Sequence, residues 1–298
     1  MYLQHFGLEQ HPFSITPDTD FFVNQGSYQE ALNVLLVALR SGEGFIKVTG
    51  EVGTGKSLLC RELLNTLDGE FVTAYLPNPF LNPTALRMAL AEELGIRFAR
   101  NIGQHRLLQL ISEHLIEISA TGKRVALLID EAQTLPDQSL EALRLLSNLE
   151  TEKHKLFQVV LFGQPELDER LEQAHLRQLK QRITFSYRIR PLDREALGHY
   201  LDHRLTVAGY SGEQLFTNMA LASLQRNSRG IPRLVNVLSH KALMSAYGRG
   251  EHLICAHHVR RAASDTEDTR ILCPHRYELV TSLFSMLTLI GGRLHGWY

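Results

Sequence analysis

Cysteine is scarce in this sequence of 298 residues, which contains only Cys60, Cys255 and Cys273. Three widely separated cysteines do not form the disulfide framework that stabilises small secreted domains, so we expect a reducing compartment. The opening residues, MYLQHFGLEQ, lack the basic cluster and apolar core of a signal peptide. We therefore expect a cytoplasmic protein.

Long apolar runs are also lacking. The longest uncharged apolar stretch is LVTSLFSMLTLIGG, which occupies residues 279–292 and has 14 residues. A helix needs about 18 to 20 apolar residues to span a bilayer, so a membrane-spanning helix is not expected. This stretch is interpreted as a packing helix, and a shallow contact with a membrane or a partner is the alternative.

An excess of charge of one sign is absent as well. The chain carries 31 basic and 32 acidic side chains, a net charge of -1, which argues against a strongly electrostatic nucleic-acid binder. The two halves differ, because residues 1–150 carry 11 basic and 18 acidic side chains, and residues 151–298 carry 20 and 14. A surface built from the second half could still meet an anionic partner.

The sequence does contain a regular alternation of β-rich and helical segments. The run RVALLID is almost continuously apolar, as expected for a central parallel strand that is covered on both faces. Strand, helix and strand at this spacing predict an α/β core with a five-stranded parallel sheet between about residues 40 and 190. The five predicted strands lie at residues 44–50, 70–77, 124–130, 156–163 and 183–189.

Helical spacing separates these strands and continues after them. Pro83 suits the first turn of a helix over 83–95, and Gly122 ends a second helix that begins at 105. Asp137 can cap a helix whose buried face holds the following residues: Ala142, Leu145, Leu146 and Leu149.

The pattern is helical from Asp193 onward, which predicts a smaller all-α domain over residues 191–264. An N-terminal segment, residues 1–39, precedes the core. The polar stretch DTEDTR begins a predicted linker and apolar tail over residues 265–298.

The string GEVGTGKS fits the phosphate-binding pattern G-x-x-x-x-G-K-[ST] and lies between a predicted strand and a predicted helix. Its three glycines let the backbone curl so that successive amides face phosphate oxygens. Lys56 would then bridge the β- and γ-phosphates, and the Ser57 hydroxyl would bind Mg²⁺. A glycine-rich turn that only caps a helix is the alternative. The residues predicted to bind nucleotide are Gly50, Glu51, Val52, Gly53, Thr54, Gly55, Lys56, Ser57 and Leu58.

Two acidic residues follow the buried strand in RVALLIDEAQ. In a parallel sheet this strand delivers Asp130 and Glu131 beside the phosphate loop. Asp130 would hold Mg²⁺ through water, and Glu131 would polarise the attacking water. The alternative is a strand end with two solvated acids. Together the two motifs favour hydrolysis of ATP over binding alone.

With these motifs the chain resembles the AAA+ ATPases, in the bacterial branch of general secretion pathway protein A and the MSHA pilus biogenesis protein MshM. The resemblance covers residues 1 to about 264 and rests on six strings in this order: FGLEQHPFSITPD, GEVGTGKS, LLIDEAQ, LFGQPEL, LRQLKQRI and SRGIPRLVN. It implies an AAA+ P-loop core followed by a helical lid.

The resemblance also implies a function. A ring or partial ring of identical chains would use ATP and Mg²⁺ to drive or regulate assembly of an MSHA type IV pilus or a type II-like secretion system. Such a protein could be peripheral at the inner membrane and contact inner-membrane components. A DNA-associated ATPase of the transposition target-selector type is the alternative, and the basic second half of the chain motivates it.

Several site roles come from the resemblance. It places Gln164 as the polar sensor of the γ-phosphate and Arg233 as the second sensor, on the lid. Arg182 takes the place of the arginine finger that reaches into a neighbouring subunit, with Arg177 as the reserve candidate. A surface salt bridge is the alternative for Arg182 and for Arg233.

Two further assignments rest on the resemblance alone. Asn78 would restrain Glu131 until a partner arrives. The segment around Pro12, Phe13 and Ile15 would lie near the adenine, and burial of Phe13 in the core is the alternative. Histidines and cysteines also gather near the end, but they match no regular zinc-ligand spacing: His252, Cys255, His257, His258, Cys273 and His275.

Overall fold

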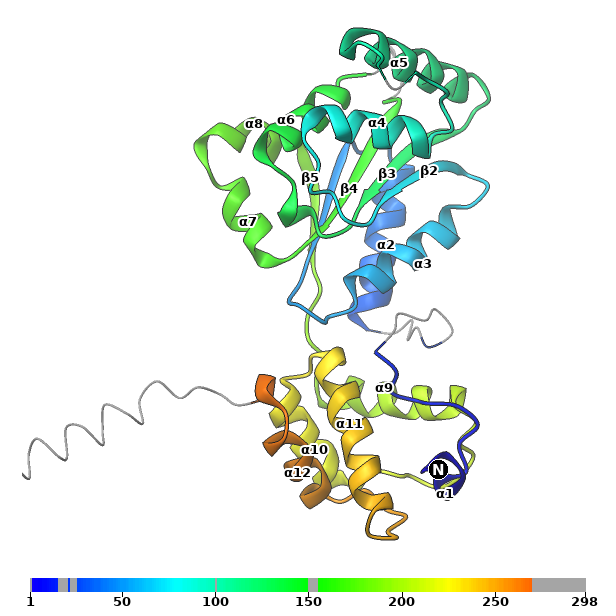
Figure 1. Cartoon of the computed structure of the whole chain (residues 1–298), viewed down its shortest axis with the longest axis vertical. Coiled ribbons are helices and arrows are strands. Elements are labelled where there is room, and N and C mark those ends of the chain that lie inside the picture. Colours follow the sequence, from blue (N-terminus) through cyan, green and yellow to red (C-terminus); the bar gives the residue numbers. More distant parts are fainter. Residues whose placement is uncertain (1, 16–20, 22–25, 100, 150–154, 270–298) are drawn as a thin grey trace, which may run out of the picture.

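The computed structural model describes residues 2–15, 21, 26–99, 101–149 and 155–269. It contains an α/β body, built around the sheet, and a helical body below it that is formed by the later helices (Figure 1). The chain passes from one to the other directly after the last strand. The predicted combination of an α/β core and a smaller helical part is confirmed.

All five predicted strands form one parallel sheet. Their order in the sheet is β2-β3-β4-β1-β5, and each of the four neighbouring pairs is parallel. β4 therefore lies between β1 and β3, so the carboxyl ends of these three strands meet at one edge. The strands span β1 Phe45–Thr49, β2 Phe71–Leu76, β3 Arg124–Ile129, β4 Phe157–Gly163 and β5 Ile183–Arg188.

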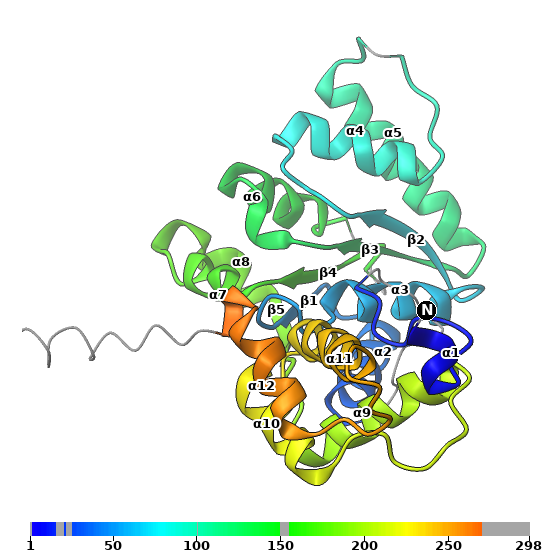
Figure 2. The same ribbon diagram turned by 60° about the horizontal axis from the view of Figure 1, so that its bottom comes forward.

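Helices cover both faces of this sheet (Figure 2). On one face Ala126 and Leu128 pack in a cluster with α2 and α3, and on the other Val125 and Leu127 pack under α4, α5 and α6. This arrangement explains why the sequence of β3 is apolar at nearly every position. The helices of this body are α2 Ser27–Arg40, α3 Lys56–Leu67, α4 Pro83–Glu93, α5 Gln104–Ala120, α6 Asp137–Leu146, α7 Pro165–Leu171 and α8 Arg177–Arg182.

The prediction for α6 is wrong in two details. Asp137 is the first residue of the helix and does not cap it, because its carboxylate accepts hydrogen bonds from Arg170 and His175 instead. Leu145 is half-exposed, since the helix ends at Leu146 and buries a face that includes Leu140. A tertiary ion pair thus overrides the local capping preference of Asp137.

Four helices and the N-terminal helix form the helical body. Asp193 and Thr217 cap the first two of these helices by accepting hydrogen bonds from the amides of Ala196 and Ala220. Helix α1 packs on α11, whereas α2 packs on the sheet, so the two ends of the predicted N-terminal segment lie in different bodies. The helices are α1 Tyr2–Phe6, α9 Arg194–Val207, α10 Asn218–Ser228, α11 Pro232–Tyr247 and α12 Ala256–Ser264.

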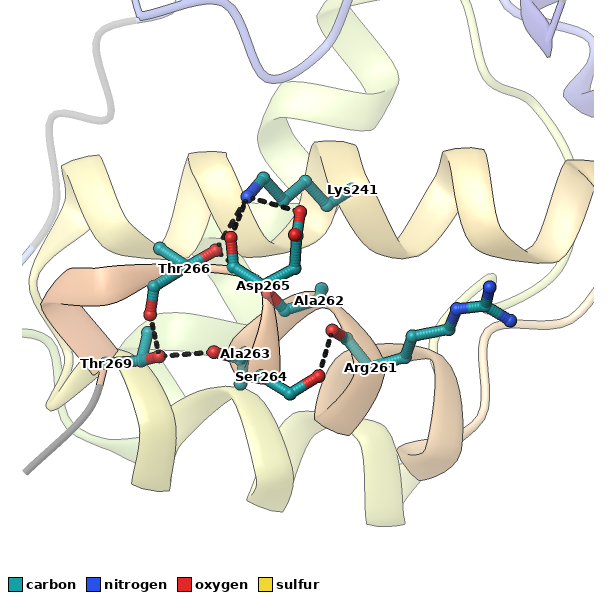
Figure 3. A network of polar contacts seen from close by, with 8 residues as sticks. All are labelled: Lys241, Arg261, Ala262, Ala263, Ser264, Asp265, Thr266 and Thr269. Atoms are coloured by element: carbon teal, nitrogen blue, oxygen red, sulfur yellow. Dashed lines mark hydrogen bonds and ion pairs between the residues drawn. The ribbon is translucent and has the colours of Figure 1, made fainter.

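Residues 265–269 pack on the helical body through a small polar network (Figure 3). The Lys241 ammonium donates to the Asp265 carboxylate and to the Thr266 hydroxyl, both at 3.0 Å. The Thr269 hydroxyl lies 2.6 Å from the carbonyl of Ala263. These residues are therefore part of the helical body, whereas the sequence predicts a linker from residue 265.

The rest of the predicted tail, including residues 279–292, Cys273 and His275, lies outside the described residues. Within the part of the chain that the structure describes, no helix has the length and hydrophobicity required to cross a bilayer.

A turn at Gly230, between α10 and α11, packs against the segment that leads from β5 into the helical body. The amide of Leu192, just after β5, donates to the carbonyl of Gly230 at 2.8 Å. Gly230 has a φ of +73°, and a Cβ at this position would lie 2.0 Å from the carbonyl oxygen of Leu192. Both the conformation and the contact therefore require glycine here.

We predict that Gly230→Ala lowers the free energy of unfolding by about 3 kcal/mol or more, because the new methyl group must displace backbone. The matched control is Gly250→Ala, which shares a positive φ of +70° but has no atom within 4 Å of its Cβ. The control should cost only about 1 to 2 kcal/mol. Urea unfolding of both variants measures the difference, and equal losses would contradict the steric explanation.

Candidate functional site

A cavity of about 330 Å³ opens at the carboxyl edge of the sheet, between the two bodies. The loop after β1 contributes Lys56 and Ser57 to its wall, β3 leads to Glu131, and β4 leads to Gln164. The adjacent order of β3, β4 and β1 brings these groups together. Arg233, near the start of α11, completes this part of the wall from the helical body.

The loop Gly50–Ser57 curls as the sequence predicts. Gly53 and Gly55 have φ values of +80° and +85°, and α3 begins directly after Gly55. A Cβ at Gly53 would lie 2.7 Å from the Cβ of Arg233, so this glycine also permits close approach of the helical body. The Tyr28 hydroxyl donates to the carbonyl of Thr54 and braces the loop from α2. The resulting amide-lined helix N-terminus is suited to an anion.

Lys56 is only 5% exposed. Its ammonium donates to the carbonyls of Gly50 at 2.8 Å and Glu51 at 3.0 Å. Burial lowers the pKa of Lys56, and nearby carboxylates, chiefly those of Glu131 and Asp130, offset part of that shift. A buried cation at a helix N-terminus fits a phosphate group, which would supply the missing negative charge.

Asp130 follows β3 and is 3% exposed. Burial raises the pKa of its carboxyl group, while hydrogen bonds from the Ser57 hydroxyl and the Glu131 amide oppose the shift. The Glu131 amide lies 2.9 Å from Asp130 Oδ1. Ser57 and Asp130 thus present adjacent oxygen atoms, which are the ligands that Mg²⁺ prefers.

Glu131 is held by two glutamine side chains. Its Oε2 accepts hydrogen bonds from Gln133 Nε2 and, at 3.0 Å, from Gln164 Nε2. The backbone amide of Gln164 donates to Gln133 Oε1 at 3.0 Å, so the three side chains are linked by hydrogen bonds. Glu131 also has a φ of +51°, which is uncommon for a residue with a side chain.

This clamp replaces one sequence-based assignment. Asn78, predicted to restrain Glu131, is exposed, and in the described residues the restraint comes from Gln133 and Gln164. Gln133 was missed, although it stands two positions after Glu131 in DEAQ. The short 3₁₀ turn Ala132–Thr134 is what brings its side chain back to that carboxylate.

The predicted arginines occupy different places. Arg233 lines the cavity, and its backbone amide donates to the Gly53 carbonyl at 3.1 Å. Arg182 lies outside the lining of this cavity, and its Nη1 donates to Ser147 Oγ at 2.8 Å, just beyond the end of α6. Arg177 is exposed at the start of α8. The cavity of one chain thus contains Arg233 but neither candidate finger.

Pro12 and Phe13 do not line the cavity. Phe13 is 2% exposed and packs edge-on against Phe216, with ring centroids 6.1 Å apart, as the burial alternative predicts. The next residues, Ser14 and Ile15, do line the wall, as does Phe21. Of the three residues of the predicted N-terminal contact, Ile15 thus lines the cavity, whereas Pro12 and Phe13 do not.

Among the described residues, Glu251, His257 and His258 bring possible ligand atoms within 4.8 Å of one another, but the proton position on His258 argues against a metal there. His258 Nδ1 accepts a hydrogen bond from the Cys255 amide at 3.1 Å, so the neutral ring carries its proton on Nε2. Nε2 is the atom that faces Glu251, at 3.3 Å, together with His257. A metal-bound histidine instead donates a proton from its second nitrogen, so this orientation opposes metal binding.

Comparison with known proteins agrees with this geometry. Residues 39–171 match the AAA domain family. The chain is 44% identical over 270 residues to general secretion pathway protein A of Aeromonas hydrophila. That alignment covers 91% of the chain and 49% of the relative, so the chain spans about half the length of the curated relative it matches.

Solved structures with this fold are more distant in sequence. Cdc6p of Pyrobaculum aerophilum gives a TM-score of 0.63 at 20% identity, covering 85% of the chain and 70% of that structure. The Aeropyrum pernix ORC2 protein gives a TM-score of 0.60 at 17% identity, and the match covers 86% of the chain and 72% of that structure. The Thermotoga maritima RuvB branch migration motor gives a TM-score of 0.54 at 15% identity, and the match covers 88% of the chain and 76% of that structure. At these identities the similarity shows the fold alone.

The structural matches establish the AAA+ P-loop fold, with its parallel sheet and helical C-terminal part. The sequence match to the secretion protein extends through both bodies. The chain therefore belongs to the AAA+ ATPases, in the family of general secretion pathway protein A.

Proposed function

We propose that this protein hydrolyses ATP in the cavity at the sheet edge. The observation that supports the proposal is the convergence there of a buried lysine in a phosphate-binding loop, the Ser57–Asp130 oxygen pair and Glu131. Lys56 would bind the β- and γ-phosphates, and Glu131 would take up a proton from the attacking water. Mg²⁺ held by Ser57, and through water by Asp130, would neutralise charge on the phosphates.

The glutamine clamp supports a controlled form of this reaction. The hydrogen bonds from Gln133 and Gln164 both end on Oε2 of Glu131, so they fix the orientation of the carboxylate and occupy that oxygen. Gln164 stands between the phosphate loop and Glu131, at the end of the middle strand of the three. If Gln164 turned toward a bound γ-phosphate, it would release one of the two bonds to Glu131. We propose this exchange as the sensing role of Gln164.

The arginines support an oligomeric active unit. Arg233 would contact phosphate within its own chain, from the helical body. Arg182 would act in a neighbouring chain, since it does not line the cavity of its own. A guanidinium is permanently charged and can donate two parallel bonds to phosphate oxygens, which suits both roles. Arg177 remains the alternative finger.

The biological role is proposed from the relative. General secretion pathway protein A of Aeromonas hydrophila supports a role in type II-like secretion, and the related MSHA type IV pilus system is included in the proposal. Hydrolysis would move the helical body against the α/β body of a ring or partial ring. This movement would act on inner-membrane components from the cytoplasmic side. Residues 279–292 are a candidate contact with the membrane.

We predict that Lys56→Ala and Glu131→Gln each lower the ATPase rate by about 100-fold or more, through loss of phosphate binding and of the base. A phosphate-release assay on purified protein measures both. Lys123→Ala, which changes an exposed lysine at the opposite edge of the sheet, is the matched control and should keep the full rate. Unchanged rates in the first two variants would remove the proposed enzyme activity.

The trans position of the finger has a separate test. Lys56→Ala and Arg182→Ala should each be inactive alone, and a mixture should recover part of the activity, because some interfaces then join an intact phosphate loop to an intact arginine. Arg177→Ala in place of Arg182→Ala tests the alternative finger. Mixed oligomers that form but show no recovery would indicate that the arginine acts within its own chain.

The DNA-associated alternative is tested by titration. We predict that duplex DNA leaves the ATPase rate unchanged even at low salt, because a chain with a net charge of -1 has little electrostatic attraction to the phosphate backbone. The assay is repeated at rising salt concentration with Lys123→Ala as the control. Binding that stimulates hydrolysis and weakens steeply with salt would favour the DNA-associated function over the secretion role.

A further inference from the structure

Arg204 is a buried charge that the proposed catalytic steps do not use. It lies on α9, the first helix of the helical body, lines the cavity and is 5% exposed. Among the described residues, the buried lysine, arginine and acidic side chains are Lys56, Asp130 and Arg204. The first two serve the phosphate end of the cavity. Burying a guanidinium costs free energy of folding, so a specific role would explain why Arg204 is kept at this position.

The guanidinium of Arg204 binds the N-terminal strip, defined here as residues 12–15 together with Phe21. Nε donates to the Pro12 carbonyl at 2.6 Å, and Nη2 donates to the Ser14 carbonyl at 3.3 Å. Its central carbon lies 4.6 Å from the centroid of the Phe21 ring, which is a cation–π distance. One side chain of the helical body thus holds the strip at three points.

Two neighbours within the helical body fix Arg204 in turn. Nη1 of Arg204 donates to the Tyr200 hydroxyl at 3.1 Å, and that hydroxyl donates to Asn236 Oδ1 at 2.9 Å. Asn236 Nδ2 lies 3.4 Å from the same Ser14 carbonyl. The strip, α9 and α11 therefore share one hydrogen-bonded group, and each of its members has a restricted orientation.

The wall built in this way is suited to an uncharged part of a ligand. Ser14, Ile15 and Phe21 line it from the strip, and Tyr200 and Asn236 line it from the helical body. The charge of Arg204 is directed at backbone carbonyls and an aromatic ring, whereas the phosphate loop carries Lys56. If the phosphates of a nucleotide occupy that loop, its base and ribose would lie against the wall formed by the strip and the helical body.

We propose that Arg204 is a positioning residue that builds the nucleoside wall of the cavity by fixing the N-terminal strip to the helical body. This inference rests on the proposed function, because it assumes that a nucleotide binds with its phosphates in the loop Gly50–Ser57. Arginine is required since a planar fork reaches three acceptors at once, which a lysine ammonium at the end of a single stem does not. The strip and the helical body then enclose the nucleoside as one unit.

The test compares a whole nucleotide with its phosphate tail alone. Binding of ADP and of inorganic tripolyphosphate, each with Mg²⁺, is measured by calorimetry on the full chain. Arg204→Lys should weaken ADP binding by about tenfold, as expected from lost charge-assisted hydrogen bonds. The affinity for tripolyphosphate should stay within a factor of about two, because the phosphate loop is intact. In steady-state assays the KM for ATP should rise about tenfold with little change in kcat.

Two more variants separate positioning from general instability. Phe21→Leu removes the cation–π contact from the strip side and should weaken ADP but not tripolyphosphate, and it decides the question alone if Arg204→Lys does not fold. Arg124→Lys is the matched control, because Arg124 also donates to two backbone carbonyls, those of Leu39 and Arg40, at the opposite edge of the sheet. It should change neither affinity.

The outcomes against the inference are distinct. Equal weakening of ADP and tripolyphosphate would place Arg204 at the phosphates, and unchanged ADP binding in both the Arg204 and Phe21 variants would remove its role. If the wild-type chain bound neither ligand, the proposed function itself would fail, and this inference with it.

Discussion

The adjacency of three parallel strands is the constraint on which the site depends. Because β4 lies between β1 and β3, the phosphate loop, Gln164 and the Asp130–Glu131 pair emerge side by side at one edge. Their strands are buried on both faces, which leaves the ends little freedom to shift. The chemistry at this edge is therefore set by the order of the sheet as much as by the residues themselves.

Contiguous motifs made much of the fold and part of the site predictable. All five strands, the loop Gly50–Ser57 and the acidic pair after β3 could be inferred, because each is encoded in a short run with its own periodicity or spacing. Contacts between distant segments could not be inferred. Two examples are the Asp137–Arg170 ion pair and the hydrogen bonds of Arg204 to Pro12 and Ser14. They join residues 33 to 192 positions apart, and no local sequence pattern predicts them.

The clamp on Glu131 shows an intermediate case. Gln133 is only two positions away from Glu131 in sequence, yet its contact depends on a left-handed residue and a 3₁₀ turn that the string DEAQ does not reveal. The same turn anchors Arg170, whose Nη1 donates to the Gln133 carbonyl. The base of the proposed reaction is thus coupled to α7 through a backbone segment of three residues.

The tight contact between Gly230 and Leu192 holds the turn before α11 against the segment that follows β5. Three residues after Gly230, the Arg233 amide donates to the Gly53 carbonyl, so α11 begins in contact with the phosphate loop. Helix α12 belongs to the same helical body and continues into residues 265–269. If the proposed hydrolysis moves the helical body as a rigid unit about these contacts, displacements grow with distance from them. A sub-ångström adjustment around the phosphates would therefore be read out as a wider swing wherever the helical body lies farthest from those contacts.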